Sequence, residues 1–318
     1  MNAEEVHLLT SASFIQGLDN LYEYDLYTTE GRFDLAYYFD GRNTVGALDQ
    51  FEYINQSSYV AASCLKTRRE YRDVAPIFIQ WYGVDYFDVR HLDKINIEGR
   101  YYYRNMFVGG AYARHDEYIN HVTYHAENDY SYAFNSGSYD SYLSNDDIYI
   151  NPYSYSYTKY AMYVDHDTYR GEIGYLFSDD FEVSLIGVDS DRIDAEFFLN
   201  VAYKYQLRDV DYIGARISLN DDIRDSSLSL KYFTVLKWGD YLSAEASLVD
   251  EDDWAVDVSY YFNERLSIGI NTAKGGMTYF RSKYYFRKNY YLMASYGRDL
   301  DPHYKIQEKV HFSVGAQF

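Results

Sequence analysis

From about residue 168 to the C-terminus, apolar and polar residues alternate along short segments. The clearest case is 253–262, where every second residue is a large apolar one, from Trp254 to Phe262. A period of two is typical of a β-strand with one apolar face. The same alternation returns in segments 195–205, 228–232, 266–271 and 280–287. The pattern predicts a run of antiparallel hairpins.

The connections between these segments alternate in length. Short polar turns are expected at 179–180, 208–210, 239–240, 263–265 and 288–289, and longer acidic connections at 189–192, 220–225 and 250–252. Short periplasmic turns and longer outer loops are typical of a bacterial membrane barrel.

The first half is less regular. Strands are expected near Val6–Phe14, Leu21–Phe39, Ser57–Leu65, Ile95–Tyr103 and Phe107–Arg114, and Tyr82–Val89 fits a strand or a loop. The total is about sixteen, an even number, as single-chain bacterial barrels require. The sequence therefore predicts an all-β chain whose residues 1–318 form a single closed antiparallel transmembrane β-barrel domain.

Residues 115–167 are rich in Tyr, Asn, Asp and Ser, and we expect them to be a long loop between the fifth and sixth strands. A barrel of this size encloses an aqueous channel, and a long loop in a compact fold is usually functional. We expect the loop to fold into the lumen and narrow it; an exposed loop on the outer surface is the alternative. The candidate constriction residues are Tyr130, Tyr132, Tyr142, Asp146, Asp147 and Lys159.

The composition excludes several classes of protein. No run of about 18 apolar residues is present, so no transmembrane helix is expected. The mean hydropathy of −0.48 does not count against a barrel, which needs an apolar residue only at alternate positions. A net charge of −20 argues against nucleic acid as a partner, and one cysteine, Cys64, excludes an internal disulfide.

The chain carries no enzyme signature. It has no phosphate-binding glycine loop, no two-histidine zinc motif on a helix and no local nucleophile–base pair. His115, His121 and His125 lack a strict metal-ligand spacing, and the acidic run Asp250–Asp253 is more typical of a solvated loop than of a calcium site. We therefore expect no catalysis, no cofactor and no bound metal.

Charged residues at the polar positions of the strands are the candidate pore-lining groups. A charge on the lipid face is costly, so strand charges are expected to point into the lumen, where they set ion preference. The same residues could instead pair across strands and stabilise the wall. They are Arg100, Arg170, Lys204, Arg216, Lys231, Arg281, Lys283, Glu98, Glu172, Glu196, Glu245 and Asp257.

The last segment separates a membrane barrel from a soluble all-β protein. Val310, Phe312, Val314 and Phe318 alternate with polar or small residues, and the chain ends on an aromatic carboxylate. This ending resembles the insertion signal of outer-membrane barrels.

Three internal stretches carry a further resemblance. Val258–Ile270 looks like the strand–turn–strand repeat of Gram-negative porins, and Gly46–Ser63 and Gly171–Phe177 resemble general porins of marine gamma-proteobacteria. The resemblance implies a bacterial outer-membrane location and, as partners, membrane lipid and lipopolysaccharide, the barrel-assembly machinery and small hydrophilic solutes. It also implies a homotrimer. Separately, no charged-then-apolar segment follows Met1, so we expect the chain to be a mature form with an added Met1, its leader removed.

Two functional classes remain open at this point. One is a porin for passive diffusion of small hydrophilic solutes or ions, or its substrate-selective relative, such as an oligosaccharide channel. The other is a non-conducting barrel used in adhesion or as a surface receptor.

Overall fold

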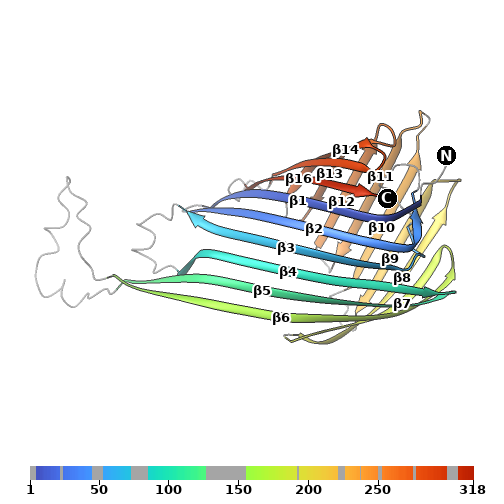
Figure 1. Cartoon of the computed structure of the whole chain (residues 1–318). Helices are drawn as coiled ribbons and strands as arrows, with labels where there is room; N and C mark the ends of the chain where they lie inside the picture. Colours follow the sequence, from blue (N-terminus) through green and yellow to red (C-terminus); the bar gives the residue numbers. More distant parts are fainter. Residues whose placement is uncertain are drawn as a thin grey trace, which may run out of the picture.

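The protein folds into one closed antiparallel barrel (Figure 1). The computed structural model describes residues 5–21, 24–44, 53–72, 85–126, 155–191, 193–220, 226–236, 238–249, 253–274, 277–298 and 307–318. Each strand pairs with its neighbours in sequence, and β1 closes the sheet against β16. The predicted barrel of about sixteen strands is confirmed. Among the described residues no helix could span a membrane.

The first six strands, of 14 to 24 residues, form a long set, whereas the ten others have 8 to 14 residues. The long set comprises β1 (Glu5–Leu21), β2 (Tyr24–Asn43), β3 (Tyr59–Arg72), β4 (Asp85–Tyr103), β5 (Met106–Ala126) and β6 (Tyr155–Ser178). The others are β7 (Phe181–Ser190), β8 (Ile193–Gln206), β9 (Tyr212–Asn220), β10 (Ser227–Val235), β11 (Tyr241–Val249), β12 (Asp253–Tyr261), β13 (Leu266–Ala273), β14 (Thr278–Arg287), β15 (Tyr290–Arg298) and β16 (Gln307–Gln317).

Both chain termini lie at one end of the barrel, on the right in Figure 1. The short turns, such as 104–105, 179–180 and 288–289, connect strands at this end. Short turns face the periplasm in bacterial barrels, so we call this end the periplasmic end.

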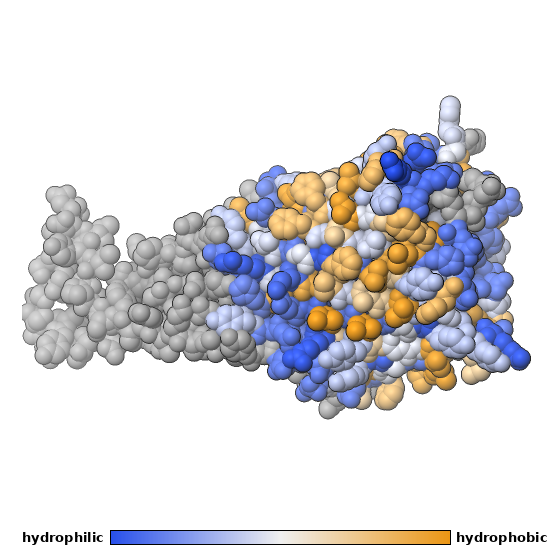
Figure 2. Space-filling view, viewed as in Figure 1, coloured by the Kyte–Doolittle hydropathy of each residue, from blue (hydrophilic) through white to orange (hydrophobic). Residues whose placement is uncertain are grey.

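Large apolar side chains cover the outside of the barrel. Trp254, Phe312 and Val314 are 41%, 57% and 52% exposed, and they stand on the predicted apolar face of their strands. Figure 2 shows apolar residues crossing the middle of the barrel as a band between more polar ends. An outward apolar band with water-facing residues inside is the arrangement that a bilayer requires.

The wall of long strands extends beyond this band. β6 has 24 residues and β13 only 8. At about 3.3 Å per residue, β6 is far longer than a bilayer needs. Its outer part and that of β5 carry ion pairs on the outward face, such as Arg114 Nη2 to Asp165 Oδ2 at 3.7 Å.

The predicted bounds of the loop 115–167 are wrong at both ends. β5 and β6 remain paired from His115–His166 to Ala126–Tyr155, so Lys159 lies in β6, opposite Val122. Beyond the membrane both faces of a strand meet water, and the alternation that reveals a strand disappears. The expected strand Leu21–Phe39 also contains a reversal, since β1 ends at Leu21 and β2 begins at Tyr24.

Candidate functional site

The connection between β2 and β3 turns into the barrel at the periplasmic end. Residues Tyr53–Ser58, here called the lumen segment, precede β3. A local turn shapes it: Ser57 N donates to Asn55 Oδ1 at 3.2 Å, and Asn55 Nδ2 donates to Ser57 O at 3.1 Å. An asparagine that bonds the backbone two residues on favours a turn over a strand.

Hydrogen bonds tie the lumen segment to the nearby wall. Phe39 N donates to Ser58 O at 2.9 Å, and Tyr102 N donates to Ser58 Oγ at 3.0 Å. The Tyr102 hydroxyl donates to Asn55 O. Gln56 Nε2 donates to Asp179 O, 3.1 Å away in the turn between β6 and β7. The segment is therefore attached to β2, β4 and the β6–β7 turn.

Apolar contacts join the lumen segment to strands on the far side of the lumen. Ile54 is 3% exposed and packs with Leu176 of β6 and Ala202 of β8. The ring of Tyr53 lies 6.0 Å from that of Tyr212, at the start of β9. In a ring of sixteen strands, β9 stands seven positions from β2, on the far wall. The segment thus bridges two nearly opposite walls and narrows the lumen.

Tyr53 occupies a slot formed by three successive inward residues of β9. The Tyr212 ring lies beside that of Tyr53 at an interplanar angle of 48°, and the Arg216 guanidinium lies 5.6 Å from the Tyr53 ring centroid. A Cβ at Gly214 would stand 2.5 Å from Cζ of Tyr53, so the ring uses the space that a side chain there would fill. Burial raises the pKa of Tyr53, while Arg216 opposes the shift, so the phenol stays neutral at physiological pH.

Four aromatic residues extend this slot along the inner wall at the periplasmic ends of β9–β12; we call them the aromatic strip. The ring of Phe233 lies 5.7 Å from Tyr212 and 6.0 Å from Tyr241, at interplanar angles of 26° and 17°. Tyr261 completes the cluster, and all four are at most 4% exposed. This strip is an apolar patch on an inner wall that is otherwise polar in membrane barrels.

A buried ion-pair cluster lies on β4, β6 and β7. Arg100 Nη2 donates to Glu172 Oε1 at 2.7 Å, and Arg100 Nη1 donates to Glu182 Oε1 at 3.3 Å. The side chains of Arg100, Glu172 and Glu182 are only 16%, 5% and 10% exposed. The Arg100 guanidinium also lies 4.3 Å from the Phe107 ring centroid and donates to Tyr102 Oη at 2.9 Å. The cluster thus supports Tyr102, which holds the lumen segment.

The other candidate pore-lining residues also stand on the inner side of their strands. Arg170 Nη2 donates to Glu172 Oε2 at 3.2 Å, Lys204 Nζ lies 2.8 Å from Asp180 Oδ1, and Arg281 Nη2 donates to Asp257 Oδ1 at 2.6 Å. Glu245 accepts from Ser229 Oγ at 3.0 Å, and the Lys283 ammonium lies 4.1 Å from the Tyr291 ring centroid. Strand alternation places Lys231, Glu98 and Glu196 on the same inner face.

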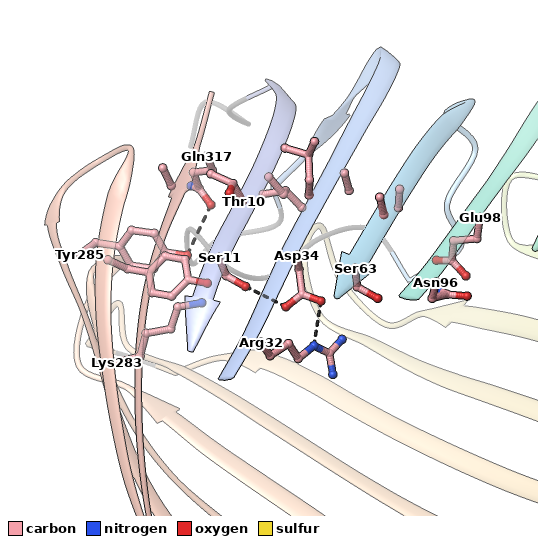
Figure 3. Close-up of a pocket in the computed structure, with 17 residues that line it drawn as sticks. Thr10, Ser11, Arg32, Asp34, Ser63, Asn96, Glu98, Lys283, Tyr285 and Gln317 are labelled. Atoms are coloured by element: carbon pink, nitrogen blue, oxygen red, sulfur yellow. Dashed lines mark hydrogen bonds and ion pairs between the residues drawn. The ribbon is translucent and has the colours of Figure 1, made fainter. Parts of the chain in front are cut away.

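A recess of about 360 Å³ opens in the inner wall near the seam of the barrel (Figure 3). Arg32 Nε donates to Asp34 Oδ1 at 2.8 Å, and Ser11 Oγ donates to Asp34 Oδ2 at 3.0 Å. Glu98 and Lys283 stand on opposite sides of the recess in Figure 3. The wall therefore presents both signs of charge to the interior.

Sequence reasoning missed the groups that narrow the lumen. Tyr53 and Ile54 lie outside the strands, where no periodicity marks them, although they fall within the porin-like stretch Gly46–Ser63. The inward position of Glu182 could have been found, because it alternates with Phe181 and Val183.

The remaining expectations concern the outer loop, the metal and the C-terminus. Tyr130, Tyr132, Tyr142, Asp146 and Asp147 lie outside the described residues. The rings of His115 and His166 stack at 4.4 Å, and the described part of the chain contains no group of three potential metal ligands. Phe318 O accepts from Leu8 N at 2.7 Å, and its ring meets Tyr290 edge-on at 5.5 Å, which anchors the end of the chain against both neighbours.

Comparison with known proteins gives a family and a fold. The family model described as "putative general bacterial porin" matches residues 79–310. No curated protein matches the chain.

Solved structures resemble the barrel at low identity. The Ralstonia pickettii toluene transporter TbuX has a TM-score of 0.52 at 10% identity, with 100% of this chain and 90% of that chain covered. A deletion mutant of the P. putida monoaromatic hydrocarbon channel TodX has a TM-score of 0.50 at 11% identity, covering 99% and 90%. Omp33 of Acinetobacter baumannii has a TM-score of 0.44 at 10% identity, covering 99% of each chain.

Proposed function

Because the chain belongs to the putative general bacterial porin family, we propose that it is a channel for passive diffusion of small hydrophilic solutes or ions. Family and barrel fold locate it in the bacterial outer membrane. The observation that carries the proposal is the inner wall, where basic and acidic side chains alternate around a water-accessible interior.

The narrowest part of the proposed path is the lumen segment at the periplasmic end. It joins the β4–β6 side of the wall to β9 through Ile54 and Tyr53. A solute entering from outside would pass the charged recess before reaching it. The connection 127–154 between β5 and β6 stays a proposed second constriction, because its residues lie outside the described ones.

Conductance of the purified protein in a planar bilayer tests the proposal. We expect stepwise ion currents, together with swelling of proteoliposomes in small sugars and amino acids. A correctly folded barrel without current above the lipid background would favour the alternative, a non-conducting barrel for adhesion or surface recognition.

A substrate-selective channel is the second candidate, and the aromatic strip favours it. These four rings are covered, and they offer contact area to an aromatic solute once Tyr53 moves aside. Two similar structures are those of a toluene transporter and a monoaromatic hydrocarbon channel, but at 10–11% identity this likeness concerns the fold. We also propose a non-catalytic role, a homotrimer, and contacts with lipopolysaccharide and the barrel-assembly machinery.

A further inference from the structure

We infer that Tyr212, Gly214 and Arg216 of β9 form a binding slot for the aromatic ring of a small phenolic solute, and that Tyr53 occupies it as a tethered ligand. The inference rests on the proposed channel only in that the solute reaches the slot through the lumen. Four features of the slot support it.

The first feature is space of the right shape. The three atoms nearest to a Cβ added at Gly214 are Cζ, Cε2 and Cε1 of Tyr53, at 2.5–2.7 Å. Any larger residue would expel the ring. The glycine therefore keeps open a ring-sized space on a wall whose neighbouring inward positions carry Tyr212 and Arg216.

The second feature is the charge above the ring. The Arg216 guanidinium lies 5.6 Å from the Tyr53 ring centroid, within the range of a cation–π interaction. This attraction comes from the electron-rich face of an aromatic ring. A saturated ring of the same size would gain none of it, so the slot discriminates by aromatic character as well as by shape.

The third feature is a hydroxyl without a partner. Tyr212 is 2% exposed, and its Oη has no hydrogen-bond partner among the described residues. A buried hydroxyl normally finds a partner, and leaving it unpaired is unfavourable. The hydroxyl of Tyr53, whose ring is held by its tether, leaves Tyr212 Oη unpaired, whereas a free phenolic solute can turn its own hydroxyl toward it.

The fourth feature is continuity with the aromatic strip. Phe233 and Tyr241 continue the stack from Tyr212 at nearly parallel angles. A ring that displaces Tyr53 therefore enters a row of aromatic faces. Because Tyr53 belongs to the lumen segment, its displacement also loosens the bridge across the lumen.

Competition between Tyr53 and a free phenol makes the inference testable. Isothermal titration calorimetry with p-cresol on refolded protein in detergent measures this binding and does not depend on whether the barrel conducts. A tether presents Tyr53 at an effective concentration in the millimolar range, so Tyr53→Ala is expected to bind p-cresol at least about tenfold more tightly than the wild type. The matched probe 4-methylcyclohexanol, which lacks the aromatic face, is expected to bind much more weakly to the same variant.

Tyr53→Ala/Gly214→Ala is the matched control, since the added methyl occupies the space that the Tyr53 ring leaves. The three atoms nearest to this methyl position all belong to Tyr53, so no other residue needs to shift. We expect it to lose p-cresol binding. Equal binding by the single and double variants, or equal binding of the aromatic and saturated probes, would overturn the slot. If the double variant fails to refold, Tyr53→Ala/Arg216→Gln replaces it and is expected to lose the preference for the aromatic probe. Absence of current in a bilayer beside positive calorimetry would reject the channel and leave the slot standing.

Discussion

Adjacent residues of one strand face different surroundings in this protein, the lipid on one side and the lumen on the other. On β12, Val258 belongs to the outward row that includes Trp254, whereas Asp257 points inward and accepts from Arg281 and from Asn271 Nδ2 at 2.6 and 3.3 Å. A substitution therefore has different consequences at successive positions, because one side chain loses lipid contact and the next loses a polar partner.

The first prediction concerns the lipid face. Val258→Arg is expected to destabilise the folded barrel by about 2–4 kcal/mol, the cost of an arginine near the membrane midplane. Ala255→Arg, on the inner face of the same strand, is the control and should cost much less. Urea unfolding in liposomes measures both. The reverse ranking would mean that the two faces are exchanged, since a slip of one residue exchanges them.

The second prediction concerns the buried cluster. Arg100→Met leaves Glu172 and Glu182 without their shared cation, and breaking a buried pair in this way typically costs about 3–5 kcal/mol. Arg100→Met/Glu172→Gln/Glu182→Gln removes both carboxylate charges. Arg170, which also pairs with Glu172, is 39% exposed and can turn to water, so most of the loss is expected to be recovered. Arg114→Met, at an exposed pair with Asp116, is the control and should change the denaturation midpoint little. A triple variant as unstable as the single one would contradict the electrostatic account.

At the scale of elements, the hairpins from β7 to β16 were predictable and the outer half of the long strands was not. Within the membrane most outward positions are apolar and a charge there is costly, so the alternation around Trp254 appears in the sequence. Beyond it, Arg114, Asp116 and Asp165 lie on the outward face, and outward positions are no longer marked by apolar residues. The lumen segment was unpredictable for another reason: the contact between Tyr53 and Tyr212 joins residues far apart in sequence, and neither residue type signals it.

The third prediction concerns the lumen segment as an element. Tyr53→Ala/Ile54→Ala removes both apolar contacts with the far wall, and we expect single-channel conductance to rise by about twofold or more as the lumen of a barrel this size opens. Val60→Ala, on the outward face of β3, is the control and should conduct like the wild type. Unchanged conductance in the double variant would place the narrowest point elsewhere.

The fourth prediction concerns a second constriction, formed by the connection between β5 and β6. Deleting residues 130–150, within the connection between β5 and β6, leaves the paired strands intact up to Ala126 and from Tyr155. A rise in conductance in a planar bilayer supports a second constriction, because removing an obstacle from an aqueous lumen widens it. Wild-type conductance together with an intact barrel would put this connection outside the pore.

At the scale of the whole molecule, closure of the barrel depends on the two ends of the chain. β1 and β16 pair in register from Leu9–Gln317 to Asp19–Gln307. The last residue adds to this seam, since Phe318 N donates to Leu8 O at 2.8 Å and Phe318 O accepts from Leu8 N at 2.7 Å. A closed sheet has no free edge, and the seam is where that closure is completed.

The last prediction separates folding from assembly at this seam. Deleting Phe318 removes one closing residue and its contact with Tyr290, but it leaves the remaining β1–β16 register in place, so refolding in detergent is expected to be largely intact. In cells, the terminal aromatic residue is expected to act as part of the insertion signal, and the yield of folded barrel in the outer membrane should fall. Heat-modifiable migration on gels measures both quantities, and Phe318→Tyr, which keeps the ring and the terminal carboxylate, is the control. Equal losses in detergent and in cells would mean that Phe318 acts only through closure of the seam, whereas an unchanged yield in cells would remove it from assembly altogether.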